Sequence, residues 1–246
     1  MSLNILLCGA GGRMGQAISS ISQEHGCTIS FPVDLDDDPA DGIESCDVVI
    51  DFSLREATLP LARLSSVAGK PMVIGTTGHG SEEKAEIEAL SSKIPMVWAG
   101  NFSTGVNLLF YLTEQAARVL DDQSDFDPEV IEMHHRLKKD APSGTADRLL
   151  EILKDSRKLG ADQVAHGRSG IVGERPAKEI GSHALRGGDV VGDHTVLFAG
   201  IGERIELTHR ASDRKIFAAG ALRAAKWVGG RSPGLYSMQD VLGLSS

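Results

Sequence analysis

Over the first hundred residues, short apolar runs alternate with segments of helical periodicity. The apolar runs have the length of strands and cover residues 4–8, 28–33, 47–52, 71–74 and 95–99. Between the first two runs, one apolar helix face is formed by Met14, Ala17, Ile18 and Ile21. Ser81, followed by two glutamates, is expected to cap a further helix. The alternation predicts βαβ units and hence a parallel sheet covered by helices.

After Asn101 the pattern changes, and a second domain is expected to begin. The elements expected there are a helix over 106–120, strands over 125–132, 194–198 and 204–208, a glycine-rich stretch over 160–192 and an Ala-rich helix over 216–228. The last helix is expected to return to the first domain. The sequence therefore predicts an α/β fold with a parallel-sheet domain, residues 1–102 and 213–246, and a second α+β domain with an open mixed sheet, residues 103–212.

Composition narrows the classes of function. The chain has 246 residues, with 25 Lys and Arg against 34 Asp and Glu, and its formal net charge of −9 argues against a nucleic-acid surface. No run approaches the roughly 18 apolar residues of a membrane span, and the first residues lack a signal-peptide pattern. We therefore expect a cytoplasmic protein without a membrane partner. The cysteines form no CxxC motif and are expected to be buried thiols, at Cys8, Cys27 and Cys46.

Glycine is enriched, at 28 residues, and three glycines mark the first predicted strand-to-helix turn. Gly9, Gly12 and Gly15 follow the spacing GxxGxxG. Glycine permits a tight turn and a close backbone approach, and the N–H groups of a helix start can hold a pyrophosphate. The turn predicts a Rossmann-like, dinucleotide-binding domain; the alternative is a glycine-rich turn without a ligand.

A carboxylate follows the second predicted strand. Asp34 lies 19 residues after Gly15, near the ~20 expected of a carboxylate that hydrogen-bonds the adenosine ribose. Residues 35–38 contain no Lys or Arg, and their three aspartates would repel a 2′-phosphate, so NADH is expected and NADPH is less favoured. After the fourth strand, Gly75, Thr76 and Thr77 form a polar turn at the sheet edge where ligands bind; a plain turn is the alternative.

Residues 132–145, EMHHRLKKDAPSGT, concentrate charged groups between a predicted strand and a predicted helix. Cations this dense favour an anionic substrate, and a His or a Lys in a partly dry cleft can exchange protons near neutral pH. Ser143, Gly144 and Thr145 would present N–H groups and hydroxyls at a helix start, which can bind a carboxylate. Adjacent His134 and His135 point to opposite sides of an extended chain, so we expect no metal. A solvated basic loop is the alternative.

Together, these motifs resemble the dihydrodipicolinate reductase family over essentially the whole chain. The resemblance rests on GAGGRMG at 9–15, GTTG at 75–78, AGNFS at 99–103, EMHHRLKKDAPSGTA at 132–146 and VVGDHTVLFAGIGERIELTH at 190–209. It implies a nicotinamide-dependent reduction of a cyclic, unsaturated dicarboxylate to tetrahydrodipicolinate in the diaminopimelate route of lysine biosynthesis. It also implies a homotetramer built through the sheet of the second domain.

The resemblance implies roles for individual residues. His134 matches an acid/base histidine and Lys138 a proton donor. The implied substrate-binding residues are His135, Ser143, Gly144 and Thr145. Arg214 aligns with a hinge position between domains that close on the substrate. The implied cofactor-binding residues are Gly9, Ala10, Gly11, Gly12, Arg13, Met14, Asp34, Gly75, Thr76, Thr77, Ala99, Gly100, Asn101 and Phe102.

Two positions depart from the family pattern. Many relatives carry Arg directly after the ribose carboxylate, where this chain has Leu35, which again favours NADH. Gly100 stands where relatives often have Pro.

Two other functions stay open: a nucleotide-sensing protein that has lost the chemistry, and a different reductase, such as an aspartate dehydrogenase acting on an acyclic imine. The choice of His134 or Lys138 as proton source, and of a hydroxylated or dehydrated substrate, is also open.

Overall fold

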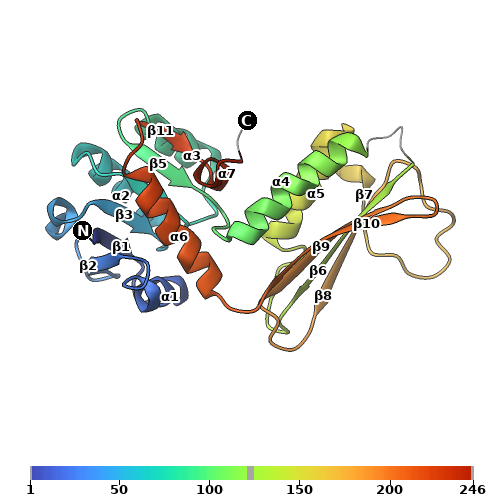
Figure 1. The fold of residues 1–246 in the computed structure, drawn as a ribbon, viewed down its shortest axis with the longest axis horizontal. Helices are drawn as coiled ribbons and strands as arrows, with labels where there is room; N and C mark the ends of the chain where they lie inside the picture. Colours follow the sequence, from blue (N-terminus) through green and yellow to red (C-terminus); the bar gives the residue numbers. More distant parts are fainter. Residues whose placement is uncertain (1, 121–124, 245–246) are drawn as a thin grey trace. The chain divides into compact units, whose positions relative to one another are not determined.

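The computed structural model describes residues 2–120 and 125–244. Two separate sheets organise the chain, and each belongs to its own unit (Figure 1). The first unit comprises Met1–Thr104 and Arg214–Ser246, and the second comprises Gly105–Asp213. The first unit is discontinuous in sequence because the chain returns to it after the second sheet is complete.

The first unit is built on six parallel strands in the order β11-β5-β4-β3-β1-β2. Because β1 pairs with β2 on one side and with β3 on the other, the direction of winding reverses between β1 and β3. In sheets of this kind, ligands bind outside the carboxyl ends of the strands at that reversal. The strands are β1 (Leu3–Cys8), β2 (Cys27–Val33), β3 (Val48–Asp51), β4 (Met72–Ile74), β5 (Pro95–Trp98) and β11 (Gly234–Tyr236).

Helices cover both faces of this sheet. One face packs against α1 (Arg13–Ile21), α6 (Lys215–Val228) and α7 (Met238–Leu242), and the other against α2 (Arg55–Val67) and α3 (Ser81–Leu90). The small side chains of Ala-rich α6 allow it to approach the sheet closely; a Cβ on Gly220 would lie 1.7 Å from the carbonyl oxygen of Phe102. Two short 3₁₀ turns, η1 (Pro39–Asp41) and η2 (Ile43–Ser45), follow β2.

The N-cap of α3 is Gly80, so the expectation that Ser81 caps this helix is wrong by one position. The carboxylate of Glu83 accepts the N–H of Gly80 at 2.6 Å and the guanidinium of Arg55 at 2.8 Å. The third residue of the helix therefore closes the helix start through its side chain, without a serine hydroxyl. A serine followed by acidic residues suits the first helical turn as well as the cap.

The second unit holds a mixed five-stranded sheet in the order β10-β9-β6-β8-β7. The neighbours β6, β8 and β7 are parallel, whereas β9 runs antiparallel to β6 and β10. Two helices pack on one face of the sheet and bury Val130, Val196 and Phe198. The elements are α4 (Thr104–Val119), β6 (Asp127–His134), α5 (Gly144–Arg157), η3 (Ala161–Gln163), β7 (Val164–His166), β8 (Ile180–Arg186), β9 (Gly192–Ala199) and β10 (Arg204–Ala211).

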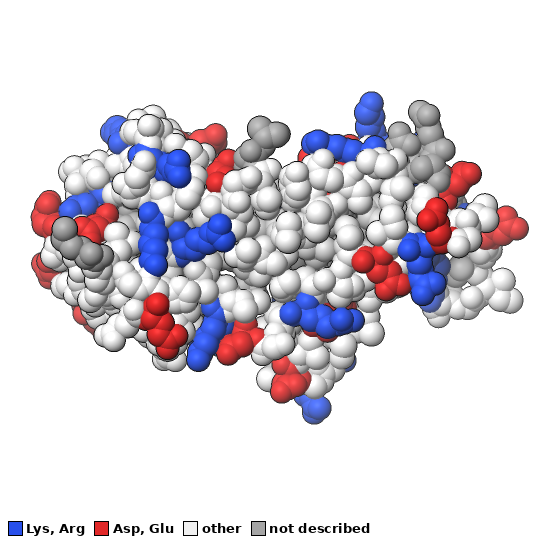
Figure 2. Space-filling view, in the orientation of Figure 1, with Lys and Arg blue, Asp and Glu red and all other residues white. Residues whose placement is uncertain are grey.

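A Rossmann-like parallel sheet with a second, mixed sheet confirms the predicted fold class. The strand expected over 125–132 instead runs from Asp127 to His134, and the glycine-rich stretch contains β7 and β8. The three cysteines are buried free thiols, as predicted. In the described residues, no helix has the length and apolar character needed to cross a membrane. On the face shown in Figure 2, basic and acidic side chains are interspersed.

Candidate functional site

The glycine turn after β1 shapes the carboxyl edge of the first sheet. Gly9 has a φ of +78°, and a Cβ there would lie 2.3 Å from the carbonyl oxygen of Phe52. A Cβ on Gly15 would lie 2.2 Å from the carbonyl oxygen of Gly9, so α1 begins in contact with the turn. Gly12, the N-cap, offers no side-chain hydrogen bond to the first turn of α1. A helix start of this kind fits a phosphate group.

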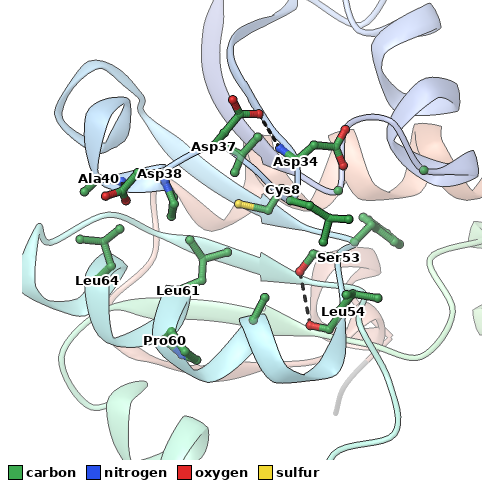
Figure 3. A pocket seen from close by; sticks show the side chains of 17 residues that line it. Cys8, Asp34, Asp37, Asp38, Ala40, Ser53, Leu54, Pro60, Leu61 and Leu64 are labelled. Carbon is green, nitrogen blue, oxygen red and sulfur yellow. Dashed lines mark hydrogen bonds between the residues drawn. The ribbon is translucent and has the colours of Figure 1, made fainter.

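Asp34 closes this turn from the end of β2. Its carboxylate oxygen Oδ2 accepts the N–H of Gly11 at 2.7 Å. The carboxylate of Asp37 accepts the N–H of Asp34 at 2.9 Å, which holds the chain after β2 in a tight bend (Figure 3). Two residues of the predicted cofactor set, Gly11 and Asp34, are therefore in direct contact.

A cavity of about 670 Å³ lies beside the glycine turn (Figure 3). Its volume lies within the range of about 300–1,000 Å³ common for small-molecule sites. Carboxylates line one side and apolar groups of α2 the other, namely Asp34, Asp37, Asp38, Pro60, Leu61 and Leu64. Among the described residues, its lining includes no Lys or Arg. The apolar slot with acidic groups at one side fits the adenosine half of a dinucleotide.

Phe52 links the other predicted cofactor segments to the glycine turn. Its ring centroid lies 5.5 Å from that of Phe102, and a Cβ on Gly75 would lie 2.2 Å from the Phe52 ring. A Cβ on Gly100 would lie 3.8 Å from Thr77, so this turn has room for a side chain. The residues of the predicted set follow the carboxyl ends of β1, β2, β4 and β5, including Ala10, Arg13, Met14, Thr76, Ala99 and Asn101.

In the second unit, β6 presents a histidine and a carboxylate on one face, because residues two apart in a strand share a face. Glu132 is only 1% exposed, and its carboxylate oxygen Oε2 contacts Nδ1 of His134. Arg186, the last residue of β8, donates from Nη1 to Oε2 of Glu132 at 3.0 Å and from Nη2 to Oε1 at 2.8 Å. The carboxylate is therefore clamped between a guanidinium and an imidazole.

These contacts determine the charge of both groups. Burial by itself would raise the pKa of Glu132, but hydrogen bonds from Arg186 and His134 outweigh it and leave that pKa lowered. Burial lowers the pKa of His134, against the opposing effect of Glu132, and the nearby cations of Lys138 and Arg186 lower it further. His134 is thus neutral at neutral pH. Its proton is on Nδ1, because an ionised carboxylate can only accept.

Ser143 caps α5 and turns its polar groups inward. Its Oγ accepts the N–H of Ala146 at 3.2 Å and lies 3.1 Å from Nε2 of His194, while its N–H donates to Oε1 of Glu132 at 3.2 Å. Burial, and then the neighbouring His134, lower the pKa of His194 to about 4. Of the three residues predicted to bind substrate here, Ser143 is buried, whereas Gly144 is exposed and Thr145 half-buried.

The turn after β6 carries the remaining predicted residues. Nζ of Lys138 lies 2.9 Å from Oδ2 of Asp140, and this contact lowers the pKa of Asp140. The N–H of Lys138 donates to the carbonyl of His135 at 3.1 Å, and both residues are half-buried. The second unit thus brings a neutral histidine, a lysine and a helix start together at the end of β6.

Three side chains of this cluster have the composition of a metal site. Glu132, His134 and His194 each offer a ligand atom, and these atoms lie within 4.8 Å of one another. The donor set does not fit a cation, because both oxygens of Glu132 bind the guanidinium of Arg186 and Nε2 of His194 contacts Ser143. That the site works without a metal stays a prediction.

Two family models together cover the chain. The model for the N-terminus of dihydrodipicolinate reductase matches residues 3–102, and the model for the C-terminus matches residues 105–242. The chain belongs to the dihydrodipicolinate reductase family. As a member of a reductase family, it is an oxidoreductase.

Curated relatives match this dihydrodipicolinate reductase family member over 99% of the chain. The 4-hydroxy-tetrahydrodipicolinate reductase of Akkermansia muciniphila is 53% identical over 99% of both chains. That of Aromatoleum aromaticum is 47% identical over 99% of this chain and 96% of the relative. A solved structure, a dipicolinate-bound dihydrodipicolinate reductase from a Paenisporosarcina species, has the same fold, with a TM-score of 0.76 at 24% identity over 98% of this chain and 99% of that one.

The sequence motifs predict no role for Glu132, Arg186 or His194 of this dihydrodipicolinate reductase family member. The spacing of two residues between Glu132 and His134 could have placed them on one strand face. Arg186 and His194 lie on other strands, and no local pattern shows which residues of β6 they face.

Proposed function

We propose that the chain catalyses the NADH-dependent reduction of a cyclic, dihydrodipicolinate-type dicarboxylate to tetrahydrodipicolinate, a step of the diaminopimelate route to lysine. The observation that carries this proposal is the turn at the end of β6, where neutral His134 and cationic Lys138 lie beside the start of α5. Proton exchange and carboxylate binding are the two tasks that a reduction of a cyclic dicarboxylate requires of a protein.

In the first unit, the glycine turn and the cavity beside it are the proposed NADH site. Bound NADH supplies the hydride that reduces the ring. The start of α1 would hold the pyrophosphate, and the carboxylate of Asp34 would accept from the ribose hydroxyls. Asp37 and Asp38 would repel a 2′-phosphate, and Leu35, which is 84% exposed, offers it no positive charge. The proposal is therefore a preference for NADH over NADPH.

In the second unit, the turn after β6 and the start of α5 are the proposed substrate and proton-donor site. The N–H groups of Gly144 and Thr145 and the hydroxyl of Thr145, together with His135, would bind a ring carboxylate. We assign proton donation to Lys138, whose ammonium carries three N–H donors, of which Asp140 takes one. His134 holds its proton on Nδ1, so Nε2 can accept from the substrate and orient it. Ser143 caps this helix start, and its contact with the substrate stays a prediction.

The second sheet is also the proposed site of homotetramer assembly. The proposed location of the protein is the cytoplasm. Its face opposite α4 and α5 exposes Ile131 at 38% and Leu185 at 45%. Apolar side chains in the middle of a sheet face favour burial against another chain. Light scattering after size-exclusion chromatography should give four times the chain mass, and Ile131→Lys should lower it. A monomeric wild-type protein would remove this part of the proposal.

The reaction is tested by following NADH oxidation while the upstream synthase supplies substrate from pyruvate and aspartate semialdehyde. We expect oxidation of NADH well above that of NADPH. Lys138→Met should lower kcat about 100-fold or more, as removal of a general acid does, with KM changed less. Lys139→Met, which removes the neighbouring exposed cation, is the matched control and should leave kcat within about twofold.

Three results would revise the proposal in different ways. Equal use of NADH and NADPH would keep the reaction but remove the argument from Asp34 and Leu35. Unchanged turnover in Lys138→Met would remove Lys138 as the proton donor. No oxidation of either cofactor, with NADH binding retained in calorimetry, would place the chain with nucleotide-sensing proteins.

A further inference from the structure

A single buried carboxylate connects the parts of the second unit that the proposed reaction uses. Oε1 of Glu132 accepts from the N–H of Ser143 at 3.2 Å and from Arg186 at 2.8 Å. Oε2 accepts from Arg186 at 3.0 Å and contacts Nδ1 of His134. The four donors come from three residues with different structural tasks: the histidine of the proposed site, a helix start and a cation from a neighbouring strand. A buried carboxylate with its lone pairs satisfied in this way is rigidly held.

The contact with Glu132 decides which nitrogen of His134 can act on a ligand. An ionised carboxylate accepts only, so Nδ1 of His134 must carry the proton and Nε2 has a free lone pair. A Cβ on Gly192 would lie 2.9 Å from that Nε2. The absence of a side chain at Gly192 therefore leaves space next to Nε2 of this buried ring.

Arg186 prevents the contact with Glu132 from stabilising the protonated, charged form of His134. An unpaired carboxylate beside an imidazole stabilises the imidazolium and raises its pKa. Arg186 binds both oxygens of Glu132 and neutralises it, and its own positive charge acts in the opposite direction on His134. The pair can thus fix the tautomer of His134 while leaving the ring neutral.

The same pair holds the segment that leads into α5. Nη2 of Arg186 donates to the carbonyl of Asp140 at 2.6 Å, three residues before Ser143. Glu132 takes the N–H of Ser143, and His194 contacts its hydroxyl. The backbone on both sides of the turn is therefore tied to one ion pair.

We propose that Glu132, clamped by Arg186, is a positioning residue that fixes the tautomer of His134 and the start of α5 together. Neither residue needs to touch the substrate. The inference rests on the proposed function for its kinetic consequences, but its effect on His134 exists in the protein without substrate or cofactor.

The test compares Glu132→Gln and Arg186→Gln by NMR titration of the His134 imidazole in the free protein, with the signal assigned by its loss in His134→Gln. Glu132→Gln removes the charge that favours the imidazolium, so the pKa of His134 should fall. Arg186→Gln leaves the carboxylate unpaired, so that pKa should rise. Opposite signs are the decisive result, because simple loosening of the fold would move both variants toward the ordinary histidine value.

Glu129→Gln is the matched control. Glu129 lies on the same strand but on the opposite face, where it pairs with Arg168 at 2.9 Å and Arg175 at 3.2 Å. This variant loses a comparable set of ion pairs and should leave the pKa of His134 unchanged. Glu132→Gln should also shift the acid limb of the pH profile of kcat and lower kcat about 10- to 100-fold, with a raised KM because the start of α5 loses its anchor.

The proposal is overturned if the pKa of His134 is the same in all variants, or moves in one direction in both. If Arg186→Gln does not fold, Glu132→Gln alone decides, since a rise or no change in the pKa of His134 there contradicts the proposal. Opposite pKa shifts in the two variants, together with a wild-type protein that oxidises no NADH, would uphold the positioning role and refute the proposed function. Normal NADH oxidation with no pKa shifts would do the reverse.

Discussion

Replacing Gly15 with Ala should destabilise the protein, although the same change in an ordinary helix interior stabilises it by about 1 kcal/mol. Gly15 lies in α1, but an added Cβ would be 2.2 Å from the carbonyl oxygen of Gly9 and 2.5 Å from that of Ala10. The first contact is more than 1 Å closer than the 3.4 Å at which ordinary contacts begin. Both obstructing atoms are backbone, so either α1 or the glycine turn must move.

The cost of such overpacking is about 3 kcal/mol at the upper end of its usual range, and the gain in helix propensity offsets about 1 kcal/mol of it. The net loss of about 2 kcal/mol corresponds to a fall in Tm of roughly 4–8 °C for a chain of this length. Differential scanning calorimetry measures it directly. An unchanged or raised Tm would refute the close approach of α1 to the turn.

Gly12→Ala provides the contrast for this experiment. A Cβ on Gly12 would lie 3.2 Å from the nearest atom, the carbonyl oxygen of Gly9, and Gly12 lines the cavity beside the turn. We expect a change in Tm of no more than about 2 °C but clearly weaker binding of NADH, because the methyl group stands where a pyrophosphate would approach. Equal loss of stability in the two variants would show that the turn has no specific contact with α1.

Three further predictions concern the second unit. Thr145→Ala should raise KM more than it lowers kcat in steady-state assays, and a fall in kcat alone would contradict carboxylate binding at the start of α5. Gly192→Ala should lower kcat about 10- to 100-fold by displacing His134, since the new Cβ would lie 2.9 Å from Nε2; wild-type turnover would show that the ring tolerates the contact. Burial lowers the pKa of His194 to about 4, so its contribution to stability is complete above about pH 6.5 and is lost as the pH falls toward 4, by up to about 3 kcal/mol. Urea unfolding of wild type and His194→Gln at pH 7 and pH 4.5 should show a smaller loss in the variant, and equal losses would refute this origin.

Five strands of the parallel sheet could be predicted because each carries its own signal, whereas the short edge strand β11 was not expected. Strands buried on both faces are continuous apolar runs, and the strand that ends at Cys8 is followed at once by the glycine turn. Single boundary residues carry a weaker signal: Ser81 is the first residue of α3 and not its cap, because the side chain of Glu83 reaches the backbone of Gly80. Such a choice depends on one side-chain rotamer, which a one-dimensional pattern does not contain.

The cluster around Glu132 depends on strand pairing between distant segments. Glu132 faces His194 across β6 and β9, and His134 faces Arg186 across β6 and β8. A register slip of one residue would move His194 to the opposite face of the sheet. The register is fixed elsewhere, by pairs such as Val130 with Val196, whose side chains are buried under α4 and α5. The geometry of the candidate proton-transfer site is therefore set by apolar packing two residues away along β6 and β9. This explains why the motif residues could be recognised in the sequence and their partners on other strands could not.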